Sequence, residues 1–184
     1  SSDLAPGLEA ITDGLARMNR TMARMPDACS KERYVEIVRP YIFGFDNITY
    51  GDDQKPRTLR GETGAQSAIV PAIDEGLGIV HSQTILTEHL ADMRNYMPRP
   101  HRAFLERMHT MGPQLRKTVL KGPVYLRRLY SDCIRALLTF NETHYRYALE
   151  YVKAKVPGNP QGTGGTPYEK WLWQLHEERK AHLI

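Results

Sequence analysis

The chain has 184 residues, of which 41% are hydrophobic and 25% charged, and its formal net charge is +4 at pH 7. These values are typical of one folded domain and exclude a disordered or collagen-like chain. The two cysteines, Cys29 and Cys133, cannot form a disulfide framework and are not spaced as a zinc pair, so we expect a reducing, cytoplasmic environment. No apolar run approaches the length of a membrane span, and no membrane partner is expected.

The positive charge does not by itself predict nucleic-acid binding. Basic residues from Arg94 to Lys117 lie close to acidic residues such as Asp92 and Glu106, and no block of like charge forms. No helix-turn-helix, zinc-finger or RNP motif is present. A mixed, solvated surface is the simpler interpretation, and we expect no nucleic-acid partner.

The first half of the chain predicts short helices separated by turns. Apolar residues at steps of three and four predict a helix over 8–25, and a serine N-cap predicts a second helix over 30–39. Residues 44–60 are rich in turn formers and should hold at most a short hairpin around 48–50. A third helix is predicted within 65–80, with a kink at its internal proline.

The second half of the chain predicts longer helices. We expect a serine-capped helix over 82–97, a break and restart over 98–108, a short helix near 115–120, and a terminal helix from Pro167. The strongest element is one long helix over 123–155. Its apolar stripe is Leu126, Tyr130, Cys133, Leu137, Phe140, His144, Tyr147 or Ala148, and Tyr151. No strand pattern of any length appears, so the predicted fold class is all-α.

The seven histidines include one in an unusual position. No His-Glu-x-x-His motif occurs, and no two histidines are four residues apart. His144 lies in an apolar stripe, between Phe140 and Tyr147, so its ring should face the interior, whereas His176 and His182 should be solvated. A core histidine bonded to backbone is the commoner interpretation, but a neutral imidazole on a buried helix face is also what proximal haem ligation requires. Both interpretations stay open from this pattern.

Two glycine-containing runs also have two interpretations each. Gly162–Thr166 is either a linker between helices or a lid that closes over a ligand, because glycine permits the backbone change and threonine can bond polar groups. It lacks the ending of a phosphate-binding loop. Gly61–Ala68 places small residues at a helix start, where a flat ligand or another helix can approach closely.

Six segments of the chain form a recognisable set. They are 39–45, 61–68, 74–79, 96–105, the helix that carries His144, and 162–166. In this order and at these spacings they resemble the indoleamine 2,3-dioxygenase family. The strings Met-Pro-x-x-His-Arg-x-Phe-Leu and Gly-Thr-Gly-Gly-Thr are specific in combination.

The resemblance covers the chain from Leu8 onward, but only the C-terminal part of the family, whose members are considerably longer. It implies that residues 1–184 form a single all-helical haem-binding domain. The N-terminal portion, which supplies much of the distal haem pocket, is then absent or carried by a separate chain of the same protein. The start at Ser1 rather than methionine fits both arrangements.

The resemblance also implies roles for individual residues. It makes His144 the proximal ligand of a b-type haem iron, with dioxygen on the opposite face. Arg39 matches the arginine that pairs with the substrate carboxylate, which suits a planar guanidinium in an apolar pocket. Tyr34 matches an aromatic residue of the indole pocket, and Thr163 matches a mobile-loop threonine near the substrate.

On the cofactor side, the resemblance places Thr63 and Gly64 over the haem and Asp74 in the proximal network. Two departures from the family pattern concern the same region. Asn141 stands where members commonly carry an arginine three residues before the proximal histidine, so the cation near a haem propionate, and the partner of Asp74, should be missing. Glu62 stands where the family usually has glycine. We therefore expect haem to bind with a less tightly held propionate.

The function that the resemblance implies is haem-dependent oxygenation of tryptophan or an indole derivative, with both oxygen atoms entering the indole C2–C3 bond. A second hypothesis keeps the haem but inserts one oxygen atom or rearranges the ring of a tryptophan derivative, as relatives in secondary metabolism do. A third is a haem-binding or partner-binding helical module without turnover.

Overall fold

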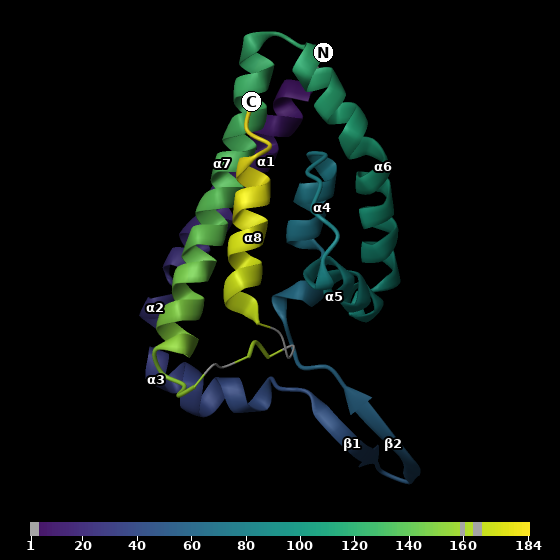
Figure 1. The fold of residues 1–184 in the computed structure, drawn as a ribbon, viewed down its shortest axis with the longest axis vertical. Coiled ribbons are helices and arrows are strands. Elements are labelled where there is room, and N and C mark those ends of the chain that lie inside the picture. The colour runs from purple at the N-terminus through teal and green to yellow at the C-terminus, as the bar shows by residue number, and fades with distance from the viewer. Residues whose placement is uncertain (1–3, 159–160, 164–166) are drawn as a thin grey trace.

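The computed structural model describes residues 4–158, 161–163 and 167–184, most of which are helical (Figure 1). The main elements are α1 (Leu4–Ala23), α2 (Met25–Ala28), α3 (Lys31–Arg33), β1 (Phe45–Tyr50), β2 (Asp53–Leu59), α4 (Ile69–Gly76), α5 (Ile85–Met93), α6 (Arg99–Lys121), α7 (Val124–Tyr147) and α8 (Tyr168–Lys180). Shorter turns are η1 (Tyr34–Val38), η2 (Arg39–Tyr41), η3 (Gly64–Gln66), η4 (Arg94–Tyr96) and η5 (Ala148–Lys153). The helical fold class is confirmed. In the described part of the chain, no helix combines the length and apolarity that crossing a membrane requires.

The core forms where α1 and α8 pack along α7 (Figure 1). The predicted stripe of α7 supplies much of it, since Leu126, Tyr130, Cys133 and Leu137 are fully buried. Helical spacing brings such residues onto one face, and burial of that face is the main source of helix stability here. As predicted, the helical segment that starts after Pro123 is continuous, and α7 passes directly into the π-helical turn η5.

Helix α6 is longer than the sequence pattern predicts. The expected break and restart near 98–100 is confirmed, because α6 begins at Arg99, but the separate helix expected at 115–120 is part of the same helix, which runs over Arg99–Lys121 with Pro113 inside it. The preceding Gly112 explains the tight packing at this point, because a Cβ there would overlap the carbonyl oxygen of Glu75 at the end of α4. The close contact with α4 fixes the middle of α6 and offsets the backbone hydrogen bond that proline removes.

The starts of α4 and α5 differ in detail from the predictions. Pro71 lies in the first turn of α4, where its missing N–H has no intrahelical partner to lose, so a kink is not required. The N-cap of α5 is Thr84 rather than Ser82, and it forms a reciprocal cap with Thr87. In contrast, Ser30 caps α3 as predicted, by accepting the N–H of Arg33.

Strands β1 and β2 form an antiparallel hairpin that projects from the helical body (Figure 1). The partners are Phe45 with Leu59, Ile48 with Arg57, and Tyr50 with Asp53. The hairpin is longer than the expected one around 48–50. It was underestimated because nearly every residue of both strands is exposed. A hairpin with no buried face has no reason to alternate apolar and polar residues, and that alternation is the sequence signal of a strand.

Candidate functional site

His144 lies in the last turn of α7. It follows Leu137 by seven residues and Asn141 by three, spacings that share a helix face. Leu137 and Asn141 are buried, but the His144 side chain is exposed. The prediction of a buried His144 is therefore wrong, although the helix face is the predicted one. The reason is that the described chain leaves the ring uncovered at this level of α7.

The surroundings of His144 favour a neutral imidazole. Partial removal from water lowers the pKa of the ring, and the positive charge of Arg179 lowers it further, with no hydrogen bond contributing within the described part of the chain. The ring of Phe140, one turn earlier, lies 6.3 Å away between centroids. A hydrogen-bonded core histidine does not fit these surroundings. An accessible neutral nitrogen is the form that can bind iron.

Arg179 of α8 is the partner of Asp74. The arginine is 2% exposed; its Nε donates to Oδ1 of Asp74 at 2.7 Å, and its Nη2 donates to Oδ2 at 2.5 Å. Its Nη1 donates to Oδ1 of Asn141 at 2.8 Å. The expectation that Asp74 lacks a cationic partner is therefore wrong, because the cation comes from α8 instead of α7. Asp74 and Asn141, both predicted on the cofactor side, are brought together by this one side chain.

The carboxylate of Asp74 also faces His81, in the loop between α4 and α5. Nε2 of His81 lies 3.4 Å from Oδ2 of Asp74, and its Nδ1 lies 2.6 Å from Oε2 of Glu178. Burial opposes the charged form of each group, but opposite charges and hydrogen bonds outweigh it. The pKa values of Asp74 and Glu178 are lowered, and the pKa of His81 is raised. Together with Arg179, these residues form what we call the charge cluster (Asp74, His81, Glu178 and Arg179).

Arg39, predicted to bind a carboxylate, is also buried, at 6% exposure. Its Nη2 donates to the backbone carbonyl of Gln161 at 2.6 Å, and its guanidinium lies 4.8 Å from the centroid of the Phe43 ring. It borders an open hollow of about 580 Å³ whose walls are mostly apolar. The lining residues are Val35, Arg39, Pro40, Phe43, Val156 and Gln161. A cation at the edge of an apolar hollow can hold an apolar molecule by its carboxylate.

Thr163 meets the segment around Gly61. Its hydroxyl donates to the carbonyl oxygen of Glu62 at 2.6 Å. A Cβ on Gly61 would overlap the carbonyl oxygen of Thr163 and come within 2.8 Å of Gly44 N and Ile42 O, so only glycine fits between these backbones. The structure therefore joins three of the predicted segments, although the loop residues 164–166 lie outside the described residues.

Thr63 and Gly64 follow directly in this segment. Thr63 caps η3 by accepting the N–H of Ala65 at 3.4 Å, and a Cβ on Gly64 would meet no atom within 4 Å. The expected small, open stretch at a helix start is therefore present. The side chain of Glu62, the departure from the family pattern, is exposed, and its backbone N–H donates to the carbonyl oxygen of Ile42 at 2.9 Å.

Tyr34 takes a different place from the predicted one. Its ring packs edge-on against Tyr151, with centroids 5.8 Å apart, within the small apolar cluster of Tyr147 and Tyr151. It does not line the hollow beside Arg39, where Val35 stands instead. Tyr34 and Val35 are consecutive residues of the π-helical turn η1, and their side chains point to different sides of it. Tyr34 packs against the apolar cluster, and Val35 lines the hollow.

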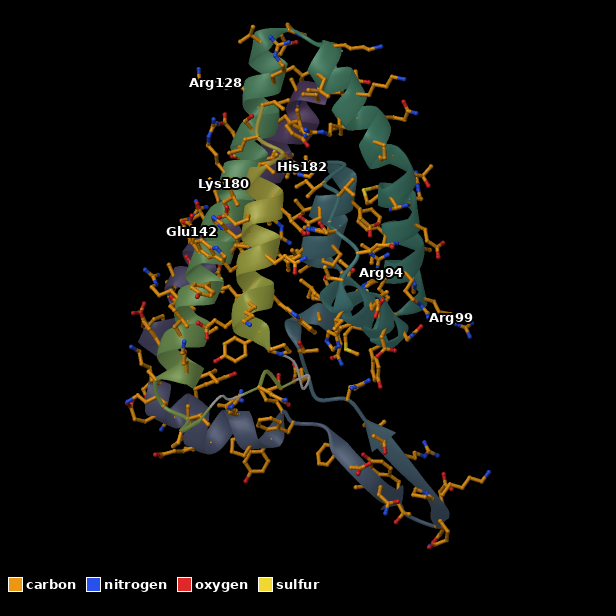
Figure 2. All side chains as sticks on the ribbon, viewed as in Figure 1. Arg94, Arg99, Arg128, Glu142, Lys180 and His182 are labelled. Atoms are coloured by element: carbon orange, nitrogen blue, oxygen red, sulfur yellow. The ribbon has the colours of Figure 1, made fainter. Side chains whose placement is uncertain are left out.

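The C-terminal helix carries a buried histidine that the sequence analysis missed. His176 is 7% exposed and stacks on Trp173 with 4.9 Å between ring centroids, so the prediction that it is solvated is wrong. His182, just after α8 (Figure 2), keeps partial exposure and accepts the Val80 N–H at 3.2 Å. The signal was present in the spacing of Leu172, His176 and Arg179, which is that of one helix face. Charged neighbours obscured it.

The described residues contain no cluster of three or more histidine, cysteine or carboxylate side chains that could hold a metal ion. The fold and site define a helical protein that carries an exposed histidine in the last turn of α7 and, elsewhere, a buried arginine beside an apolar hollow.

This chain belongs to the indoleamine 2,3-dioxygenase family, whose model matches residues 1–181. It is 31% identical to "Indoleamine 2,3-dioxygenase 2" of Homo sapiens over 213 residues, covering 98% of this chain and 52% of the relative. It is 31% identical to "6-hydroxytryptophan 2,3-dioxygenase" of Fusarium equiseti, covering 71% of this chain and 34% of the relative. It is also 26% identical to "Myoglobin" of Haliotis madaka, covering 81% and 42%. The chain spans about half the length of the curated relatives that it matches.

Proposed function

We propose that this chain is the histidine-bearing part of a haem-dependent oxygenase that acts on tryptophan or an indole derivative. The observation that carries the proposal is Arg39, a nearly buried cation that no carboxylate of the described chain pairs, at the edge of an apolar hollow. A buried charge without a counter-ion is costly, so this position favours a bound anion. An amino acid with a flat apolar side chain supplies both the anion and the apolar surface.

The residues also fit a haem iron. His144 offers an accessible ring that lacks a hydrogen-bond partner in the described chain, and its lowered pKa keeps the nitrogen lone pair available at neutral pH. Asn141 lies one turn before His144 on α7 and accepts a hydrogen bond from Arg179 of α8, so this pair can orient this side of the site. A haem held at His144 would supply the activation of dioxygen.

Residues of this chain would bind the substrate, orient it and exclude water. Arg39 fixes the substrate carboxylate, and the apolar walls formed by Val35, Phe43 and Val156 hold the ring and exclude water. Thr163, bonded to the Glu62 carbonyl, holds the loop before residue 164 against the segment of Thr63. We propose that both atoms of dioxygen are inserted at the indole C2–C3 bond; the two relatives are each named a 2,3-dioxygenase, which supports this choice over mono-oxygenation.

A complementary portion completes the pocket in this proposal. The hollow beside Arg39 and the ring of His144 are both open to the outside, and the relatives are about twice as long as this chain. We propose that a portion corresponding to the rest of the relatives' length, on this protein or on a separate chain, supplies the missing walls.

Absorption spectroscopy tests the haem assignment directly. The purified protein, loaded with haem, should show a Soret band, and His144→Ala should abolish stoichiometric haem incorporation. His109→Ala is the matched control, because His109 is exposed on the long helix α6 and should leave the band unchanged. A full haem complement with an imidazole-type spectrum in His144→Ala would contradict the assignment.

Mass spectrometry of the product, after incubation with tryptophan, a reductant and labelled dioxygen, tests the reaction. Two labelled atoms in the ring-opened product support dioxygenation. One labelled atom supports the mono-oxygenation hypothesis. Stable dioxygen binding without turnover would support a non-catalytic haem module, an alternative favoured by the similarity to the Haliotis "Myoglobin".

A further inference from the structure

Three helices meet at a single buried guanidinium, that of Arg179. Through its bonds to Asp74 and Asn141, α8 is fastened to α4 and α7. These bonds use three of the five N–H groups of the arginine. The two remaining N–H groups, one on each Nη, make no hydrogen bond within the described part of the chain.

The bond to Asn141 makes Arg179 relevant to His144. Asn141 precedes His144 by one turn on the same face of α7, so whatever holds Asn141 also fixes the turn that carries the imidazole. The charge of Arg179 acts on the ring of His144 itself, which places the guanidinium within electrostatic reach of the candidate ligand. Asn141 has no charge to supply, and its amide oxygen is used to accept from Arg179.

Asp74 holds the guanidinium in place from the opposite side. The carboxylate binds Arg179 through both oxygens, and a fork of this kind fixes the plane of the guanidinium as well as its position. Asp74 is itself shared with His81, which Glu178 holds in turn. The arginine is therefore fixed by rigid, buried partners, as outer groups around a metal ligand usually are.

We propose that Arg179 is the positioning residue of the His144 turn, and that it supplies from α8 the positive charge that the family resemblance places at position 141 of α7. The inference rests on the proposed haem function. In this arrangement, haem retention depends on the docking of the C-terminal helix. Haem bound at His144 would bring acidic groups, and the two N–H groups of Arg179 that are unused in the described chain would be available to hold one of them.

The test compares Arg179→Met with the wild-type chain loaded with haem. The variant keeps the volume of the side chain but removes its charge and all its hydrogen bonds. The rate of haem transfer to an excess of an apoglobin acceptor should rise by about tenfold to one-hundredfold, the range typical for loss of an outer partner of a metal ligand. Hydrogen exchange of the amides around His144 should become faster as well.

Arg94→Met is the matched control. Arg94 forms an ion pair with Glu75, the neighbour of Asp74 on α4, but in Figure 2 α4 lies between Arg94 and α8. This variant should lower the melting temperature without changing the rate of haem loss. The relocated variant, Asn141→Arg with Arg179→Met, returns the charge to α7 beside Asp74 and should restore most of the haem retention.

The outcomes separate the two proposals. Haem loss at the wild-type rate in Arg179→Met, with a lowered melting temperature, would show that Arg179 only fastens the helices, and would overturn the inference while leaving the haem function intact. Equal haem loss in Arg94→Met and Arg179→Met would also overturn it, because general destabilisation would then explain both. A wild-type chain that takes up no haem would remove the proposed function, and the inference with it.

Discussion

Arg39 shows how burial can turn a common surface residue into a recognition group. A long cationic side chain normally extends its charged end into water. Here the guanidinium is enclosed by the ring of Phe43 and the carbonyl of Gln161, which are both neutral. The backbone bond orients the fork but does not cancel the charge. Arg39 is therefore organised for an anion before the anion arrives, which lowers the entropic cost of binding.

Arg39→Met should raise the KM for tryptophan by at least about thirtyfold, because a desolvated, charge-assisted pair contributes about 2–5 kcal/mol. The KM for tryptamine, which has no carboxylate, should change little, and so should the Soret band. Steady-state kinetics with both substrates provides the measurement. Arg33→Met, at an exposed position six residues before Arg39, is the control and should leave both KM values unchanged. An equal change for the two substrates would show that Arg39 serves packing only.

At this scale, the residues named in advance came from the resemblance to the family. It singled out Arg39, Asp74 and Thr163, and the structure gives each a specific partner. Arg179 could not be named, because its role depends on α8 lying against α4 and α7, a tertiary arrangement that helical spacing does not contain. The exposure of His144 also depends on what covers a helix face rather than on the face itself.

Among the elements, the contact between Gly61 and Thr163 controls the shape of the substrate side. The segments 42–44, 61–63 and 161–163 approach so closely that no Cβ fits at Gly61. The Arg39 bond to Gln161 and the Thr163 bond to Glu62 hold the same loop at two points. The position of the loop therefore depends on the absence of one methyl group.

Gly61→Ala should displace the loop and destabilise the protein by about 1–3 kcal/mol, the usual cost of overpacking. Denaturant unfolding measures the free energy, and limited proteolysis near residue 161 reports the displacement. Gly14→Ala is the control: its Cβ would meet no atom within 4 Å in α1, and alanine there should stabilise the helix by roughly 0.5–1 kcal/mol. Unchanged stability and cleavage in Gly61→Ala would mean that the loop adapts freely.

The elements that the sequence predicted best are those with a clear repeat of apolar residues and with one buried face. The long segment after Pro123 has such a stripe, and α7 was predicted with nearly correct bounds. The hairpin was underestimated because it has no buried face, and α6 was divided because the local effect of Pro113 outweighed its tertiary support from α4. Local rules fail at these positions because packing decides them.

Across the whole molecule, the charge cluster connects α8 to α4 and to the loop that follows α4. His81 faces Asp74 on one side and Glu178 on the other, and the positive charge of Arg179 on α8 opposes its protonation. Since the two carboxylates outweigh Arg179, the folded protein holds the proton of His81 more tightly than the unfolded chain does. The docking of α8 therefore depends on pH.

The pH dependence has a defined sign. The pKa of His81 is raised above its ordinary value of 6.5, so its contribution to stability is fully present below pH 6.5 and is lost as the pH rises through the higher folded pKa. The pKa values of Asp74 and Glu178 are lowered from 3.8 and 4.5, so their contributions are present above these values and are lost as the pH falls through the lower folded pKa values. The cluster should therefore stabilise the fold most between pH 4.5 and 6.5.

His81→Gln should remove the part of the stability that the wild-type chain loses as the pH rises above 6.5. The difference in free energy of unfolding between the wild-type chain and the variant should be largest near pH 6 and should shrink steadily as the pH is raised to 9. Urea unfolding at a series of pH values measures it. The lowered pKa values of His89 and His144 act in the opposite direction, but both proteins contain these histidines, so their effects cancel in the difference. His101→Gln, at an exposed position of α6, should give a difference near zero at every pH. A wild-type minus His81→Gln difference that stays constant from pH 6 to pH 9 would show that His81 binds its proton equally in the folded and unfolded chains, and that the docking of α8 does not depend on it.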